Sequence, residues 1–160
     1  MSTTQPIIPT AVWLILFPVT FAIHFAEEYW GGEGYPAYLF RLRGVELSTR
    51  RFVAFQTIGL ALFVAAGIIA EYLSFPQFMI VVLSGLVLSN GITHMITAMW
   101  DGRYGPGLFS SVLLWIPLGS LSIVFMFDRI SHTSLAVATL IGFAINGIIA
   151  LIAMRGGRLA

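Results

Sequence analysis

Five apolar stretches, each long enough to cross a lipid bilayer as a helix, constrain the fold of this chain more than any other feature. They lie near residues 8–29, 52–72, 76–100, 107–127 and 134–154. A bilayer core of about 30 Å is crossed by roughly 20 helical residues, and backbone polar groups within lipid must pair inside their own helix. The sequence therefore predicts an all-α polytopic membrane helical bundle of about five transmembrane helices. We expect one transmembrane domain over residues 1–160.

The composition argues against a water-soluble domain. Of the 160 residues, 58% are hydrophobic and 9% are charged, and the mean hydropathy is +0.93. A net charge of +1 gives no reason to expect nucleic-acid binding. The chain has no Cys, so any metal would need nitrogen and oxygen ligands. The expected partners are membrane lipids and an apolar small-molecule or lipid substrate, with a homo-oligomer as an open alternative.

The basic residues, all of them Arg, predict the orientation of the helices. Connections on one expected side carry Arg41, Arg43, Arg50, Arg51, Arg103, Arg155 and Arg158. The connections on the other side carry only Arg129. Because positively charged loops stay in the cytoplasm, we expect an outside N-terminus, a cytoplasmic C-terminus and a multi-pass protein of the plasma (inner) membrane. Residues 37–43 mix aromatic, aliphatic and Arg side chains, which indicates an interfacial helix that covers the inner surface as a lid.

The end of the first span carries three ionisable side chains, in the order His24-Phe-Ala-Glu27-Glu28. Both acids lie within roughly 60° of His24 around a helix, so one face presents an imidazole and two carboxylates. Ionisable groups inside a span are costly and usually face the bundle interior. This face can bind a cation or move a proton.

A second polar stripe runs along the third span and includes Asn90, His94 and Asp101, which share one helix face. Gln56 in the second span and Asn146 in the fifth fall at the same depth, because alternate spans reverse direction. The convergence predicts one buried site in the inner half of the membrane. An apolar cavity above this layer would suit a lipid or isoprenoid tail.

Structural explanations remain open for several of these residues. Glu27 and Glu28 at a headgroup boundary would pair with Arg50 or Arg51. The side chain of Asn146 would form a hydrogen bond between two helices. Tyr104, in a turn rich in Gly and Pro, would either end the third span or line the site.

Three ordered motifs resemble those of the HXXEE-motif family of small integral membrane proteins. The chain reads His24-Phe-Ala-Glu27-Glu28, then Asn90-Gly-Ile-Thr-His94, then Tyr104-Gly-Pro106-Gly107. The resemblance extends from the first span to the start of the fourth. The family has no established activity, so the resemblance supports a site at these residues and no particular reaction.

The leading hypothesis is a membrane-embedded, metal-dependent enzyme, a hydrolase or an oxidoreductase, that acts on a lipid-like substrate. The predicted ligands of a divalent Zn or Fe ion are His24, Glu27, Glu28 and His94. Glu27, Glu28 and His94 are the predicted catalytic residues, because a bound metal would activate water or polarise a carbonyl beside them. The predicted supporting residues are Asn90, Asp101, Tyr104, Asn146 and Gln56.

Two further hypotheses stay open. A metal-free isomerase would pass protons to and from a double bond through Glu27 or Glu28. A proton-coupled small-molecule transporter would use an intramembrane His and Glu relay equally well. Five spans without internal symmetry argue against the transporter, unless two copies assemble.

Overall fold

The computed structural model describes residues 9–155, and all of its regular structure is helical. The helices are α1 (Thr10–Trp30), α2 (Tyr35–Arg43), α3 (Thr49–Tyr72), α4 (Pro76–Asp101), α5 (Leu108–Ser110), α6 (Ile116–Met126) and α7 (His132–Arg155), with a π-helical turn η1 (Ser111–Trp115) between α5 and α6. No strand occurs among the described residues. The prediction of an all-α fold is confirmed.

Five helical segments are long and apolar enough to cross a membrane. They are α1, α3, α4, the continuous run Leu108–Met126 and α7. Each lies within a few residues of an expected span. Ile8, where the first expected span begins, and Arg158, used to predict the orientation, lie outside the described residues. The protein has the architecture of an integral membrane protein, and the orientation of its ends stays a prediction.

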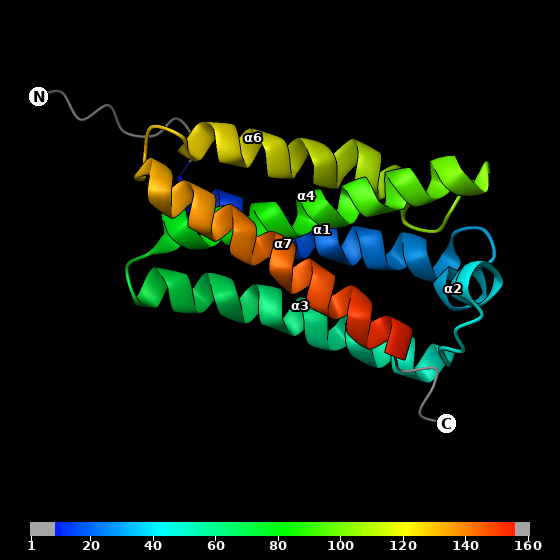
Figure 1. Ribbon diagram of the computed structural model, residues 1–160. Coiled ribbons are helices and arrows are strands. Elements are labelled where there is room, and N and C mark those ends of the chain that lie inside the picture. The colour runs from blue at the N-terminus through cyan, green and yellow to red at the C-terminus, as the bar shows by residue number, and fades with distance from the viewer. Residues whose placement is uncertain (1–8, 156–160) are drawn as a thin grey trace, which may run out of the picture.

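Helix α4 forms the centre of the bundle, with the other long helices arranged around it (Figure 1). Half of its most apolar 18-residue window is buried, against 11% for α3 and 17% for α7. The core against α4 includes Phe17, Trp115 and Met126, none more than 1% exposed. Because α3 and α7 keep most of their aliphatic surface exposed, they present the apolar exterior that a lipid environment requires.

Helix α2 lies across one end of the bundle, beside the last turns of α1 and the first turns of α3 (Figure 1). Its side of the bundle has a small hydrophobic cluster of its own, which includes Leu39, Val45 and Phe52. The Arg41 guanidinium also donates two hydrogen bonds of 2.8 Å to the Asp101 carboxylate at the end of α4. The segment expected to form an interfacial helix is therefore helical and tied to the bundle. Its place on a membrane surface stays a prediction.

Two glycines fold the chain back over this same end. Helix α4 stops at Gly102, whose φ of 65° is left-handed, and the next helical run starts from Gly107, with a φ of 86°. Pro117 then follows η1, and its ring excludes the regular hydrogen bond of the preceding turn, which accounts for the widened π-helical segment. The turn between α4 and α5 consequently lies against the last turns of α1.

Candidate metal centre

A group of two imidazoles and one carboxylate is buried where α1 and α4 meet. His24 and Glu28 come from successive turns of α1, and His94 comes from α4. Glu28 Oε1 lies 3.6 Å from His24 Nε2 and 3.3 Å from His94 Nε2. One ligand atom from each of the three residues falls within 4.8 Å of the others. The side chains of His24, Glu28 and His94 are 1%, 5% and 9% exposed.

Ser110 orients the His24 ring. Ser110 Oγ lies 2.8 Å from His24 Nδ1, so the hydroxyl and the imidazole share a hydrogen bond. The same oxygen lies 3.3 Å from the Gly107 carbonyl oxygen. His24 Nε2 is buried, has no hydrogen-bond partner and lies 3.6 Å from Glu28 Oε1. That nitrogen is left available to a metal ion or a proton.

Two neighbours hold the His24 ring in place. The Trp115 indole stacks on it with ring centroids 3.7 Å apart, and the His94 ring meets it edge-on at 4.9 Å. On another side the Gly107 backbone closes over the group. A Cβ added at Gly107 would lie 2.7 Å from His24 Cε1 and 2.9 Å from His94 Cε1. Only Gly leaves room for the three side chains to meet.

Glu28 has a further partner on α3. Gln56 Nε2 donates a hydrogen bond to Glu28 Oε2, while Oε1 faces the two imidazoles. The bond to Oε2 thus orients the carboxylate, and Oε1 is left facing His24 and His94. Gln56 is the predicted supporting residue that the structure places directly against the centre. Metal ligands are commonly held by such outer hydrogen bonds.

Glu27 has a different environment from the one expected for a metal ligand. Its carboxylate accepts hydrogen bonds from the Tyr104 hydroxyl at 2.7 Å and from the backbone N–H groups of Phe109 and Ser110 at 2.8 and 2.6 Å. It lies outside the group formed by His24, Glu28 and His94. Of the four predicted ligands, the structure therefore brings His24, Glu28 and His94 together, and metal binding by Glu27 stays a prediction. Glu27 caps the start of the fourth span, where N–H groups have no partner of their own.

The remaining supporting residues lie further out. Asn90 Nδ2 donates a hydrogen bond of 3.1 Å to Asn146 Oδ1, which joins α4 to α7. This is the bond between helices that the structural explanation of Asn146 predicted. Asp101 pairs with Arg41 and so ties α2 to the bundle. Tyr104 reaches the site only through Glu27. None of these three interactions orients His94 directly.

Pairing with Arg50 or Arg51 does not account for the buried acid. Glu28 as a whole residue is 3% exposed, and its carboxylate lies against the two histidines and Gln56. Glu27 has its bonds with Tyr104 and the start of the fourth span. Both acids are therefore engaged within the bundle end.

Trp115 is a residue of the site that was not found from the sequence, and the contact of Arg41 with Asp101 was not predicted either. Trp115 lies in a uniformly apolar run, and nothing in its spacing distinguishes it from a lipid-facing aromatic residue. The contact of Arg41 with Asp101 joins residues 60 positions apart. For Trp115, the only available signal was Pro117 two residues later, which predicts a local disturbance of the helix.

The tyrosines around the centre lie outside the candidate spans and are held in their neutral form. Burial, with the nearby Glu28 charge, raises the pKa of Tyr35 well above its ordinary value. Burial also raises the pKa of Tyr104, with its hydrogen bond to Glu27 and the Glu27 charge as further causes. Tyr35 lies with its ring centroid 6.1 Å from that of His94. Both hydroxyls therefore remain proton donors across the neutral range.

The donor set fits a transition metal. Two imidazole nitrogens and one carboxylate oxygen are the ligands used by catalytic zinc sites and by non-haem iron sites, which leave further positions open. The unpartnered Nε2 of His24 is an independent indication, because a buried polar atom usually has a partner. Within residues 9–155, the three side chains can hold a metal ion.

Fold and site together define a class: a small polytopic helical membrane protein with a buried His and Glu group able to hold a metal. A family model described as "Protein of unknown function with HXXEE motif" matches residues 15–125, and the chain belongs to this family. The matched region contains all three motifs, from His24 to Gly107. No curated protein and no solved structure matches the chain.

Proposed function

We propose that this protein is a membrane-embedded, metal-dependent enzyme that acts on a lipid or isoprenoid-like substrate near the cytoplasmic face. The observation that carries the proposal is the convergence of His24, Glu28 and His94, with ligand atoms within 4.8 Å of one another. Three ionisable groups buried together in an apolar bundle are costly to maintain without a role. A divalent cation would offset the Glu28 charge and occupy the free lone pair on His24.

The residues around the centre have distinct tasks in this proposal. His24, Glu28 and His94 would hold the metal through His24 Nε2, a Glu28 oxygen and His94 Nε2, and Ser110 would orient the His24 ring through Nδ1. Glu27 is a positioning residue, because it fixes the segment that carries Ser110. A metal bound here supplies a Lewis acid that activates water or polarises a carbonyl. Hydrolysis and oxidoreduction are the reaction classes compatible with zinc and with iron.

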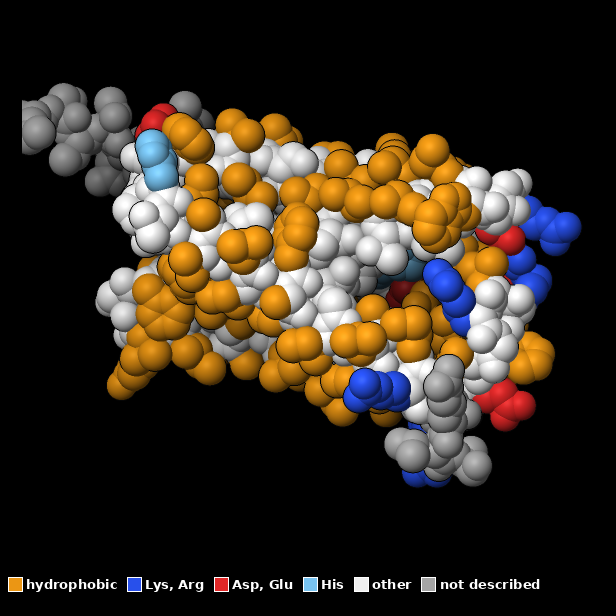
Figure 2. All heavy atoms as spheres, viewed as in Figure 1, with side chains coloured by type: hydrophobic (Ala, Val, Ile, Leu, Met, Phe, Trp, Pro, Cys, Tyr) orange, Lys and Arg blue, Asp and Glu red, His pale blue; other side chains and the backbone are white. Residues whose placement is uncertain are grey.

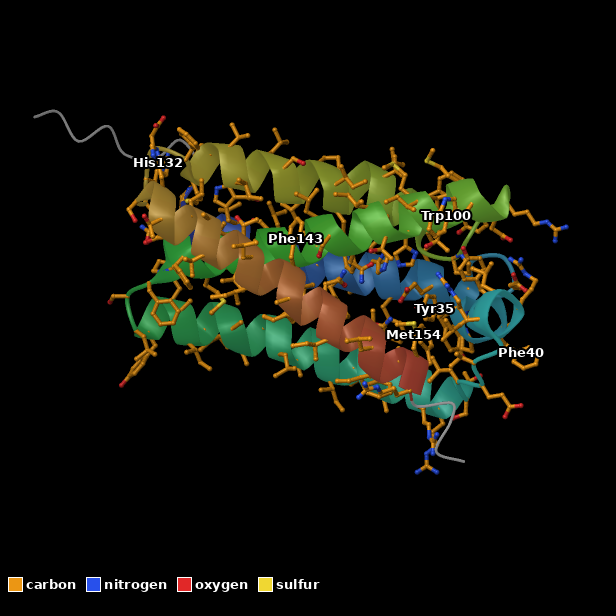
Figure 3. All side chains as sticks on the ribbon, viewed as in Figure 1. Tyr35, Phe40, Trp100, His132, Phe143 and Met154 are labelled. Carbon is orange, nitrogen blue, oxygen red and sulfur yellow. The ribbon has the colours of Figure 1, made fainter. Side chains whose placement is uncertain are left out.

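Elemental analysis of the purified, full-length protein tests the metal. We expect about one zinc or iron per chain in the unaltered protein, since a centre of this type binds a single ion. His94→Ala should lose most of it. The control is His132→Ala, which removes the histidine at the opposite end of the bundle (Figure 3). Metal-free protein that is also unchanged by added zinc, iron or chelator would refute the proposal.

A metal-free acid and base catalyst is the second candidate, favoured by one observation. Glu28 Oε1 lies between the Nε2 atoms of His24 and His94, at 3.6 and 3.3 Å, an arrangement suited to passing a proton. Isomerisation of an apolar double bond would need nothing else. Activity that survives complete chelation and is abolished by Glu28→Gln would favour this candidate over the metal enzyme.

The proposed orientation has a separate test, because the chain has no Cys of its own. Arg103 follows α4 at the end of the bundle that carries α2, and Thr133 lies in the first turn of α7 at the opposite end. In intact cells, a membrane-impermeant thiol reagent should label Thr133→Cys and spare Arg103→Cys. The reverse pattern would place the centre near the outer face.

A further inference from the structure

A hollow leads into the metal centre from the side of the bundle. Figure 2 shows it on the half of the molecule nearer α2, with a histidine and an acidic side chain visible at its bottom. His132 lies at the opposite end (Figure 3), so this histidine belongs to the pair formed by His24 and His94. His94 is the more accessible of the two, with 9% of its side chain exposed against 1% for His24.

The hollow exists because α7 leaves α4 partway along its length. The first half of α7 packs along α4, while its last turns run obliquely away from it (Figure 1). Asn90 and Asn146, joined at 3.1 Å, are a contact between the two helices. Beyond Asn146, Ala150 and Ala153 share its helix face, at intervals of four and seven residues. Both are half-buried, and their small side chains add little bulk to this face of α7.

The surroundings of the hollow combine an apolar exterior with positive charge at one end. Arg side chains stand near its rim on the side of α2, and hydrophobic side chains cover the rest of this face (Figure 2). Helix α2 ends at Arg43 and α7 ends at Arg155, and both side chains are exposed. Neither forms an ion pair with another described residue between 9 and 155. Each is available to an anionic headgroup.

We propose that a membrane-dissolved amphiphile with an anionic, oxyanion-bearing head enters the centre laterally between α4 and α7. Its head would lie between the Arg side chains and the group of His24, Glu28 and His94, and its chain would extend along the apolar exterior of α7. The inference rests on the proposed function for its chemistry, but the binding itself needs no turnover. It names the substrate class as anionic lipids, as opposed to neutral lipids or water-soluble anions.

Photolabelling of the full-length protein in phosphatidylcholine nanodiscs tests this inference with three diazirine probes. The first is a long-chain alkyl phosphate, the second has the same chain with a phosphocholine head, and the third is a short-chain alkyl phosphate. We expect the first probe to label peptides from the second halves of α4 and α7 most strongly. Two Arg side chains near a headgroup should favour it over the second probe by roughly tenfold or more. Equal labelling by the second or the third probe would overturn the inference.

Variants locate the entry. Ala150→Trp should fill the gap and lower labelling by the long-chain phosphate severalfold, and Ala153→Trp serves as a second filling variant. The matched control is Ala144→Trp, which adds the same bulk on an exposed position of α7 away from the Asn146 face. Replacing both Arg43 and Arg155 by Gln should remove the preference for the phosphate head. Unchanged labelling in both filling variants would show that the probe does not enter here.

The metal content of the same samples separates this inference from the proposed function. Specific labelling of protein that holds no metal and is unchanged by added zinc, iron or chelator would sustain the lateral anionic site and refute the metal enzyme. Protein that holds its metal but shows no preference among the probes would sustain the metal centre and refute the lateral anionic site. Ala150→Trp should retain the metal content of the unaltered protein, because Ala150 is not among the three ligands.

Discussion

The Ser110 backbone N–H donates a hydrogen bond of 2.6 Å to Glu27 Oε2, although the two residues are 83 positions apart in the chain. Through Ser110 the same contact reaches His24, whose Nδ1 lies 2.8 Å from Ser110 Oγ. The two adjacent acids of the HXXEE motif therefore have different partners. Glu28 faces the imidazoles, and Glu27 holds the segment that orients one of them.

Replacing each acid by its amide should have different effects: Glu27→Gln should lower stability, and Glu28→Gln should lower metal binding. In Glu27→Gln the side-chain amide would direct its own N–H groups at donors, so at least one N–H or hydroxyl loses its acceptor. We expect a loss of about 0.5–1.5 kcal/mol in the free energy of unfolding, the usual net contribution of one hydrogen bond, because these bonds are only partly buried. Glu28→Gln should mainly abolish metal binding. Thermal unfolding in detergent, beside elemental analysis, measures both, and equal metal loss in both variants would contradict the separate roles.

Ser110→Ala should weaken metal binding without removing a ligand. The His24 ring would lose the hydrogen bond that orients it through Nδ1, and the loss of outer partners of this kind typically changes metal affinity by about 10–100-fold. Competition with a chelator of known affinity measures the change. Ser111→Ala is the matched control, because Ser111 Oγ is buried without a hydrogen-bond partner. If the two variants bind metal equally well, Ser110 does not orient His24 for metal binding.

Gly107→Ala should disrupt the centre itself. The added methyl group would meet both imidazoles, at 2.7 and 2.9 Å, and the backbone φ of 86° disfavours any side chain. Gly102→Ala is the control, since it has a φ of 65° but open space around its Cβ position. Both variants carry the backbone strain, so the contact with the imidazoles is the difference between them. We expect metal loss in Gly107→Ala alone, as measured by elemental analysis.

Stability should fall at alkaline pH through Tyr104. Its pKa in the folded protein is raised by burial and by its bond to Glu27, so the neutral phenol is favoured in the fold. Below the ordinary pKa of about 10 this contribution is fully present. As the pH rises further, the unfolded chain loses its phenol proton first and the folded state is progressively destabilised. Unfolding curves between pH 8 and about 11 should show a smaller decline for Tyr104→Phe, whereas identical declines would exclude Tyr104 as a cause.

The membrane architecture could be predicted because hydrophobic length is a local property. A span of this kind satisfies its backbone within its own helix, so no knowledge of neighbours is needed to recognise it. Two motifs lie on α1 and α4, and the third directly precedes the run from Leu108; all three helical segments were placed within a few residues of their observed ends. The positions of His24 and Glu28 on one face of α1 followed from helical periodicity in the same way.

The assignment of partners could not be predicted to the same degree. Periodicity placed Glu27 on the same face as Glu28, and the two differ only in which neighbour each meets. That neighbour is set by Gly102 and Gly107, whose left-handed backbone returns the chain over the end of α1. Gln56 was expected at the right depth, but only the packing of α3 beside α1 brings its amide to Glu28.

The sequence by itself determined an all-α chain with five apolar helices and a layer of His, Glu and Asn side chains near one end, because burial in lipid selects residues one helix at a time. Only the tertiary structure decided that His24, Glu28 and His94 form the group and that Glu27 supports it. A metal ligand is defined by distances of a few ångströms between side chains from different helices. Those distances depend on how the helices pack and where the turns send the chain, which periodicity within one helix does not encode.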